Sequence, residues 1–105
     1  MIELSTKATI LLEILKRLEA VDSEHKVNIY DIMKELDDTD LREIIPELED
    51  YEIDNLECEM TQKSISTTLA SLVRKGLIEK TGVSSVQIEG ITRNIRSYYL
   101  TNNQE

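Results

Sequence analysis

The sequence of 105 residues has no tryptophan or phenylalanine, one cysteine, one proline and one histidine. The lone Cys58 excludes an intramolecular disulfide, and its two glutamate neighbours disfavour the reactive thiolate. His25 alone cannot build a His/Cys metal cluster or a Ser-His-Asp triad. Few prolines and glycines disfavour a turn-rich all-β sandwich. We therefore expect no enzyme, no metal and no cofactor.

Long apolar runs and glycine-rich phosphate loops are missing as well. No segment approaches the roughly 18 apolar residues that a membrane span needs. The first residues lack the basic start and the cleavage site of a signal peptide. With the unpaired cysteine, these features predict a cytoplasmic protein that does not contact a membrane. The 40% of apolar residues suffices for one core, so we expect a single domain over residues 1–105.

Charge is one-sided, because 21 acidic against 12 basic side chains give a net charge of −9. The distribution is uneven. Residues 1–60 hold 18 acidic and 6 basic groups, whereas residues 61–105 hold 3 acidic and 6 basic groups. The average acidity therefore does not exclude nucleic acid as a partner of the second part. We expect two surfaces with different tasks.

Apolar spacing in the first part predicts two helices. Ser5 is typical of a helix N-cap, and the residues after it keep helical spacing over about 6–21. Ile10 and Ile14, with Ile2 and Leu4 ahead of the helix, add apolar surface beyond what one small core needs, so part of it could contact a second subunit. After one or two strand residues at Val27, Asn28 is expected to cap a helix over about 29–36.

The acidic segment 37–60 has a mixed pattern. Its first apolar residues keep helical spacing until Pro46, so either a short helix ends near Ile45 or a new helix starts there. Tyr51, Ile53 and Leu56 could continue that helix or lie extended. We expect an acidic helical excursion over this segment.

Residues 61–101 predict a helix followed by a β-hairpin. Thr61 suits an N-cap and Gly76 a C-cap, which indicates a helix over about 61–76. Strands are expected over about 77–81 and 95–101, pairing as a hairpin with a long tip at about 82–94. Tyr98 and Tyr99 are expected mainly in cross-strand packing.

This order of elements, with the segment KSISTTLASLVRKGLIEK at 63–80, resembles the recognition helix and first wing strand of MarR-type and related winged-helix regulators. The segment RSYYLT at 96–101 resembles the strand that returns from their wing. The resemblance implies a mainly α protein with a small β-hairpin (α+β). Its fold would be a winged helix-turn-helix with an acidic insertion, about 37–60, between helices 2 and 3. Relatives have only a short turn at that place.

The resemblance implies a sequence-specific, DNA-binding transcriptional regulator. Helix 61–76 has a suitable apolar side in Ile65, Leu69 and Leu72, and a small polar side that fits a major groove about 12 Å wide. Lys63 near its start and the arginines of the wing supply cations for phosphates or the minor groove. The expected contacts to double-stranded DNA are Gln62, Lys63, Ser64, Ser66, Thr67 and Ser71 in the helix, and Arg93 and Arg96 in the wing.

The six basic groups of residues 61–105 give a monomer few phosphate contacts, so we expect a homodimer that reads two half-sites. The two protomers would meet through the first helix or through the acidic excursion. The alternative is a winged-helix protein-interaction module, or a DNA-mimicking inhibitor, that binds a protein partner through segment 37–59. A plainer interpretation makes that segment a solvated surface that keeps the protein soluble. The carboxylates of the alternative site are Asp37, Asp38, Asp40, Glu43, Glu47 and Glu49.

Overall fold

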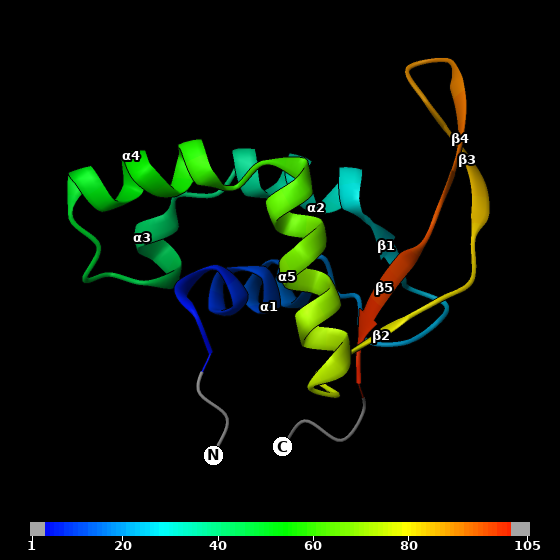
Figure 1. Ribbon diagram of the computed structural model, residues 1–105, viewed down its shortest axis with the longest axis horizontal. Helices are drawn as coiled ribbons and strands as arrows, with labels where there is room; N and C mark the ends of the chain where they lie inside the picture. Colours follow the sequence, from blue (N-terminus) through cyan, green and yellow to red (C-terminus); the bar gives the residue numbers. More distant parts are fainter. Residues whose placement is uncertain (1–3, 102–105) are drawn as a thin grey trace.

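A computed structural model describes residues 4–101 and shows an α+β protein (Figure 1). The expected mixture of helices with a few antiparallel strands is thus confirmed. The helices are α1 (Thr6–Arg17), α2 (Ile29–Asp37), α3 (Leu41–Ile44), α4 (Asp50–Glu59) and α5 (Gln62–Arg74). The strands are β1 (Val27–Asn28), β2 (Ile78–Lys80), β3 (Ser84–Ile88), β4 (Ile91–Ile95) and β5 (Ser97–Leu100).

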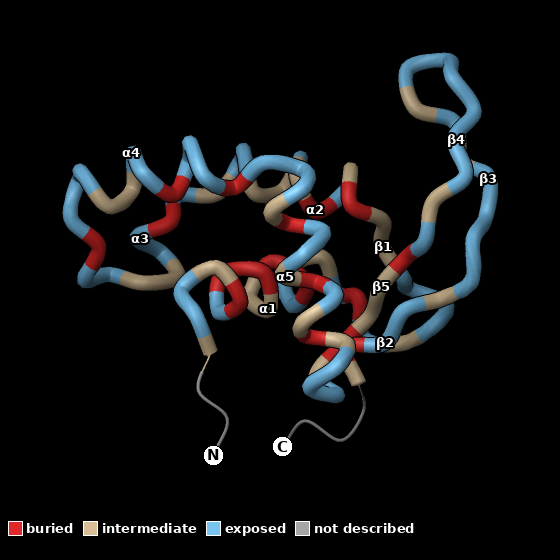
Figure 2. Tube along the Cα trace, in the orientation of Figure 1, coloured by how far each residue is buried: buried red, intermediate tan, exposed pale blue. Residues whose placement is uncertain are grey.

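The core lies where α1, α2 and α5 pack on one another (Figure 2). Its largest fully buried side chains are all Leu or Ile, each contributing about 1.5–3 kcal/mol by leaving water. Ile10 and Ile14 are completely buried in this core. These two residues are therefore not available to a second subunit, because α2 and α5 both pack against α1. Leu4 packs partly on the core, and Ile2 lies outside the described residues.

The predicted N-caps of α1, α2 and α5 are confirmed. The Ser5 hydroxyl accepts a hydrogen bond from the Ala8 N–H at 3.2 Å, and the Thr61 hydroxyl accepts one from the Ser64 N–H at the same distance. The Asn28 side chain accepts from two N–H groups in the first turn of α2. Each cap satisfies donors that have no partner inside the helix.

The apolar spacing predicts that the first helix continues to about residue 21, but α1 ends at Arg17. Glu19 takes the left-handed conformation with φ 57°, and its N–H bonds to the Lys16 carbonyl. The Ala20 N–H then bonds to the Leu15 carbonyl, which completes a Schellman motif. This turn buries Ala20 and leaves Val21 49% exposed. The same motif ends α5, with Gly76 at φ 76°.

The acidic segment contains two helices. Helix α3 ends at Ile44, and Pro46 lies in the connection to α4, so the short-helix alternative is confirmed. Tyr51 and Ile53 lie in α4, so the extended alternative is wrong. Leu41, Leu48 and Leu56 bury their side chains against the core and thereby hold the segment in place. Figure 1 shows α3 and α4 at the opposite end of the protein from the β3–β4 hairpin.

Strand β5 is central in an antiparallel sheet with the order β1-β5-β2. The predicted pairing of strands 77–81 and 95–101 is confirmed, with Ile78 opposite Leu100 and Lys80 opposite Tyr98. The tip between them is not an open loop, because β3 and β4 form a second two-stranded ladder. Glu89 at φ 54° and Gly90 at φ 79° close it with the left-handed pair typical of a type I′ turn.

Candidate nucleic-acid interface

An open groove of about 610 Å³ runs between α5, the start of α2 and the base of the β3–β4 hairpin. One wall consists of Gln62, Lys63, Ser66 and Thr67, and the other of Ile29, Ile95, Arg96 and Tyr98. Five of the eight predicted DNA-binding residues therefore meet in one place, which we call the groove. They come from two segments separated by nearly thirty residues of sequence, Thr67 to Arg96.

The α5 wall faces the groove because of how this helix is anchored. Ile65, Leu69 and Leu72 are buried, which fixes the rotation of the helix about its axis. The groove residues of α5 lie on its exposed side. The Thr67 hydroxyl donates to the Lys63 carbonyl at 3.0 Å, so its oxygen keeps free lone pairs toward solvent. This wall presents small polar groups, one amide and one cation.

The opposite wall combines a cation with an aromatic ring. Tyr98 packs partly on the core and also lines the groove. Burial raises the pKa of the Tyr98 phenol, and the nearby Arg96 charge partly offsets that rise. Lys80 stands directly opposite Tyr98 on β2, so the two side chains share one face of the sheet. The second wall of the groove thus presents one cation, Arg96, beside an aromatic ring held by the sheet.

Three predicted contacts lie outside the groove lining. Ser64 is half-buried, and its hydroxyl accepts a hydrogen bond from Lys7 Nζ of α1 at 3.2 Å. Ser71 is half-buried in the second half of α5. Arg93 is exposed on β4, opposite Val86, farther along the hairpin. The candidate interface therefore centres on the first half of α5 and on the hairpin base.

Ile29, Ile95 and Tyr98 also line the groove, and Lys80 pairs with Tyr98 on the neighbouring strand, but sequence reasoning did not include these four among the DNA contacts. The strand register supplies the missing signal for two of them, because pairing β2 with β5 places Lys80 beside Tyr98. Ile29 comes from the start of α2, and only the packing of α2 on α5 brings it there.

Lys63 and Arg96 form no ion pair within residues 4–101. By contrast, Lys7, Arg17 and Arg42 each lie beside a carboxylate. The cations of the groove are therefore available to an external anion. Lys7 also lies 3.5 Å from Glu59, which offsets the acidic charge nearest the start of α5.

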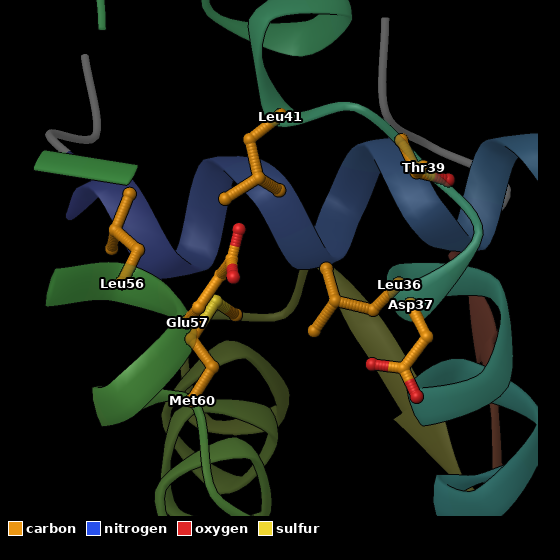
Figure 3. A pocket seen from close by; sticks show the side chains of 7 residues that line it. All are labelled: Leu36, Asp37, Thr39, Leu41, Leu56, Glu57 and Met60. Atoms are coloured by element: carbon orange, nitrogen blue, oxygen red, sulfur yellow. The ribbon is translucent and has the colours of Figure 1, made fainter. Parts of the chain in front are cut away.

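Several carboxylates of the alternative protein-binding site serve the local structure. Asp40 caps α3 by accepting from the Arg42 N–H at 3.0 Å, and Glu43 pairs with Arg17 at 3.4 Å. Glu49 stands at the N-cap of α4. The other three have no such role: Asp38 stands at the C-cap of α2, Glu47 lies between α3 and α4, and Asp37 lines a separate pocket (Figure 3). All six carboxylates are exposed.

Most of this acidic surface is screened from the groove. Helix α2 touches the groove with Ile29 and reaches the acidic segment with Asp37. Ile29 and Asp37 are eight residues apart along α2, which corresponds to about 12 Å. This distance exceeds the screening length of about 8 Å at physiological salt. The repulsion expected between the acidic segment and a bound polyanion is therefore weak at the groove.

Comparison with protein families, characterised proteins and solved structures finds no match to this chain. Any function proposed for this chain therefore has to be argued from the geometry of the groove. Within residues 4–101, no group of three or more His, Cys, Asp or Glu side chains is arranged to hold a metal ion. No helix in the same range is long and apolar enough to cross a bilayer.

Proposed function

We propose that this chain is a winged helix-turn-helix protein that binds double-stranded DNA sequence-specifically in the cytoplasm and regulates transcription. In this proposal α5 is the recognition helix, the strands after it form the wing, and α3 with α4 form the acidic insertion. The observation that carries the proposal is the groove itself. Unpaired Lys63 and Arg96 face it from two walls, beside Gln62, Ser66 and Thr67.

The side chains on the exposed face of α5 fit the chemistry of a major groove. Gln62 offers an amide that can pair with the donor and acceptor of adenine. Ser66 and Thr67 are small enough for the backbone to approach the bases, and their hydroxyls bond to bases or phosphates. Lys63 lies in the first turn, where the free N–H groups and the helix dipole also favour a phosphate.

The hairpin supplies the second contact. Arg96 at its base and Arg93 farther along reach the phosphate backbone or the adjacent minor groove. Because one protomer offers so few cations, the proposal includes a homodimer that reads two half-sites about 34 Å apart. Sedimentation of the free protein and of its DNA complex measures this stoichiometry directly.

A mobility-shift selection from a pool of genomic fragments at low salt tests the function. The proposal predicts that a subset of fragments is retained and shares a short common sequence. Gln62→Ala should weaken binding to that sequence by about 5- to 150-fold and relax the preference at one base pair. Asn55→Ala, an equivalent amide removal on exposed α4, is the control and should change neither. Retention of no fragment would overturn the proposal.

The second candidate is a protein-interaction module, or a DNA-mimicking inhibitor, that uses segment 37–59. It is favoured by the 13 acidic side chains in residues 31–60 against Lys34 and Arg42. Neutralising two exposed carboxylates, Glu47→Gln with Asp54→Asn, separates the candidates. Loss of a captured partner with unchanged DNA affinity supports the interaction module, whereas unchanged capture argues against it.

A further inference from the structure

The α5 wall of the groove has few groups that distinguish one base pair from another. Arginine is the usual reader of guanine, and a carboxylate accepts from cytosine. No charged residue follows Lys63 on α5 until the last turn, and no carboxylate of residues 4–101 lines the groove. In the proposed interface Lys63 and Arg96 contact the DNA backbone or the minor groove. The groups left to select bases in the major groove are the side chains of Gln62, Ser66 and Thr67.

Thr67 differs from Ser66 in what it presents to the groove. Its hydroxyl donates its proton to the Lys63 carbonyl, one turn back along the helix, at 3.0 Å. This hydrogen bond selects one rotamer about the Cα–Cβ bond and so fixes the position of the γ-methyl group. Because Thr67 is exposed, that methyl group is a preformed apolar contact on the α5 wall. A serine has no such group.

Thymine is the base whose major-groove edge carries a methyl group, at C5. A contact between this group and the Thr67 methyl removes both from water, whereas the bare C5 edge of cytosine has no methyl group to bury. The remaining thymine group in the major groove, O4, is only an acceptor and does not compete for the hydroxyl proton that Thr67 gives to Lys63. The chemistry of Thr67 therefore favours thymine.

Gln62 favours the same kind of base pair at a different position. Its amide matches the donor and the acceptor of adenine. Thr67 follows Gln62 by five residues, a rise of about 7.5 Å along α5. Successive base pairs are about 3.4 Å apart along the duplex, so the two side chains contact different base pairs. Both line the same groove, because buried Ile65 and Leu69 fix the rotation of the helix.

We propose that the groove selects A·T base pairs, and that Thr67 determines this specificity by contacting the C5-methyl group of one thymine in each half-site. The proposal rests on the DNA-binding function proposed above. Gln62 binds an adenine of a nearby base pair from the same side of the duplex. The preferred ligand is thus double-stranded DNA in which A·T pairs lie close together where the first half of α5 enters the major groove.

The test replaces thymine by deoxyuridine, one position at a time, in a fragment retained by the mobility-shift selection. This change removes the C5-methyl group and keeps the base pair. Fluorescence anisotropy at 0.15 M salt measures the Kd. At one thymine of each half-site the change should raise the Kd about fourfold, which corresponds to about one buried methyl group. A common sequence without A·T pairs, or a Kd that deoxyuridine leaves unchanged at every position, would overturn the proposal.

Two matched variants assign the methyl contact to one residue. Thr67→Ser removes the γ-methyl group and keeps the hydroxyl that bonds to Lys63. It should raise the Kd about fourfold, and deoxyuridine at the sensitive position should then cause no further loss. Thr68→Ser is the control, because Thr68 also donates one turn back, to the Ser64 carbonyl at 2.9 Å, but does not line the groove. It should change neither value, and equal behaviour of the two variants would contradict the role of Thr67.

The selection and the deoxyuridine series fail in different ways. Retention of no fragment at low salt would exclude DNA binding itself. Retention of fragments with a common sequence, together with an affinity that is insensitive to deoxyuridine, would leave DNA binding intact and exclude only thymine recognition by Thr67.

Discussion

Glu19 and Gly76 occupy equivalent left-handed positions at the ends of α1 and α5. Glycine adopts this conformation without steric penalty, whereas a glutamate brings its Cβ close to the following carbonyl oxygen. A side chain at Gly76 would meet nothing within 4 Å, so only backbone strain opposes one there. The two positions therefore form a natural pair for measuring that strain.

Glu19→Gly should raise the free energy of unfolding by about 0.5–1 kcal/mol, and Gly76→Ala should lower it by about 1 kcal/mol. Urea unfolding followed by circular dichroism measures both. The first substitution removes a Cβ from a left-handed position and the second adds one, so the two changes in the free energy of unfolding should have opposite signs. A loss of stability in Glu19→Gly would contradict the left-handed end of α1.

His25 and Asp22 form the other residue-scale test, with 2.7 Å between His25 Nδ1 and Asp22 Oδ1. The hydrogen bond with Asp22, and then its charge, raise the pKa of His25 above the usual 6.5. The same bond with His25 lowers the pKa of Asp22 below 3.8. The histidine's stabilisation is complete below its unfolded pKa and is lost as pH rises through the folded value. The stabilisation from Asp22 is complete above its unfolded pKa and is lost as pH falls through its lowered folded pKa.

In an NMR titration of the His25 ring, Asp22→Asn should move its pKa down toward 6.5. The asparagine keeps an oxygen for the backbone N–H groups of Glu24 and His25, so the turn stays intact. Asp38→Asn, a neutralisation at the far end of α2, should leave the His25 pKa unchanged. An unchanged pKa in Asp22→Asn would show that the pair is absent in solution.

The elements differ in how far the sequence determines them. Helix starts were predictable because Ser5, Asn28 and Thr61 act through local hydrogen bonds. The end of α5 was marked by glycine, whereas the end of α1 was hidden because a glutamate takes the same conformation. Pro46 left two possibilities that only the burial of Leu48 and Leu56 against the core decides.

In the candidate site, too, some residues follow from local sequence and others only from tertiary packing. The α5 wall of the groove follows from one helical face, so Gln62, Lys63, Ser66 and Thr67 could be predicted. The second wall joins Ile29 to Tyr98, which are distant in sequence and meet only through packing and strand register. Ser64 looked equivalent to Ser66, but one residue's helical rotation turns it toward Lys7.

The β3–β4 hairpin projects from the body, and its two strands contact chiefly each other (Figure 1). The Thr81 N–H and hydroxyl bond to Ser97 below it and close the sheet independently. Replacing residues 83–95 with Asn-Gly, a type I′ turn, should therefore change the Tm by only a few degrees. DNA affinity should fall and depend less on salt, because Arg93 is lost.

Thermal denaturation and fluorescence anisotropy measure these two effects separately. Arg93→Gln in the full chain is the matched variant, since it removes the charge and keeps the hairpin. Arg93→Gln should reproduce most of the change in the salt dependence of DNA affinity. A large loss of stability in the shortened protein would show that the hairpin is part of the core.

At the scale of the whole molecule, the charge of −9 separates into an acidic end and a groove with unpaired cations. Figure 1 shows that α3 and α4 extend away from the hairpin side, and only the end of α4 adjoins the start of α5. Neutralising Glu47 and Asp54 should therefore change DNA affinity less than twofold at 0.15 M salt. The effect should grow at 0.01 M, where screening extends to about 30 Å.

The most direct test of the DNA-binding groove is the salt dependence of affinity for a selected fragment in the wild type, Lys63→Gln and Lys75→Gln. Both variants remove one lysine charge, but Lys75 lies about 18 Å farther along α5. If the groove binds DNA, Lys63→Gln should weaken binding and reduce the slope of log K against log salt by about 0.9 per protomer. Lys75→Gln should leave that slope unchanged, and equal slopes in the two variants would show that DNA does not bind in the groove.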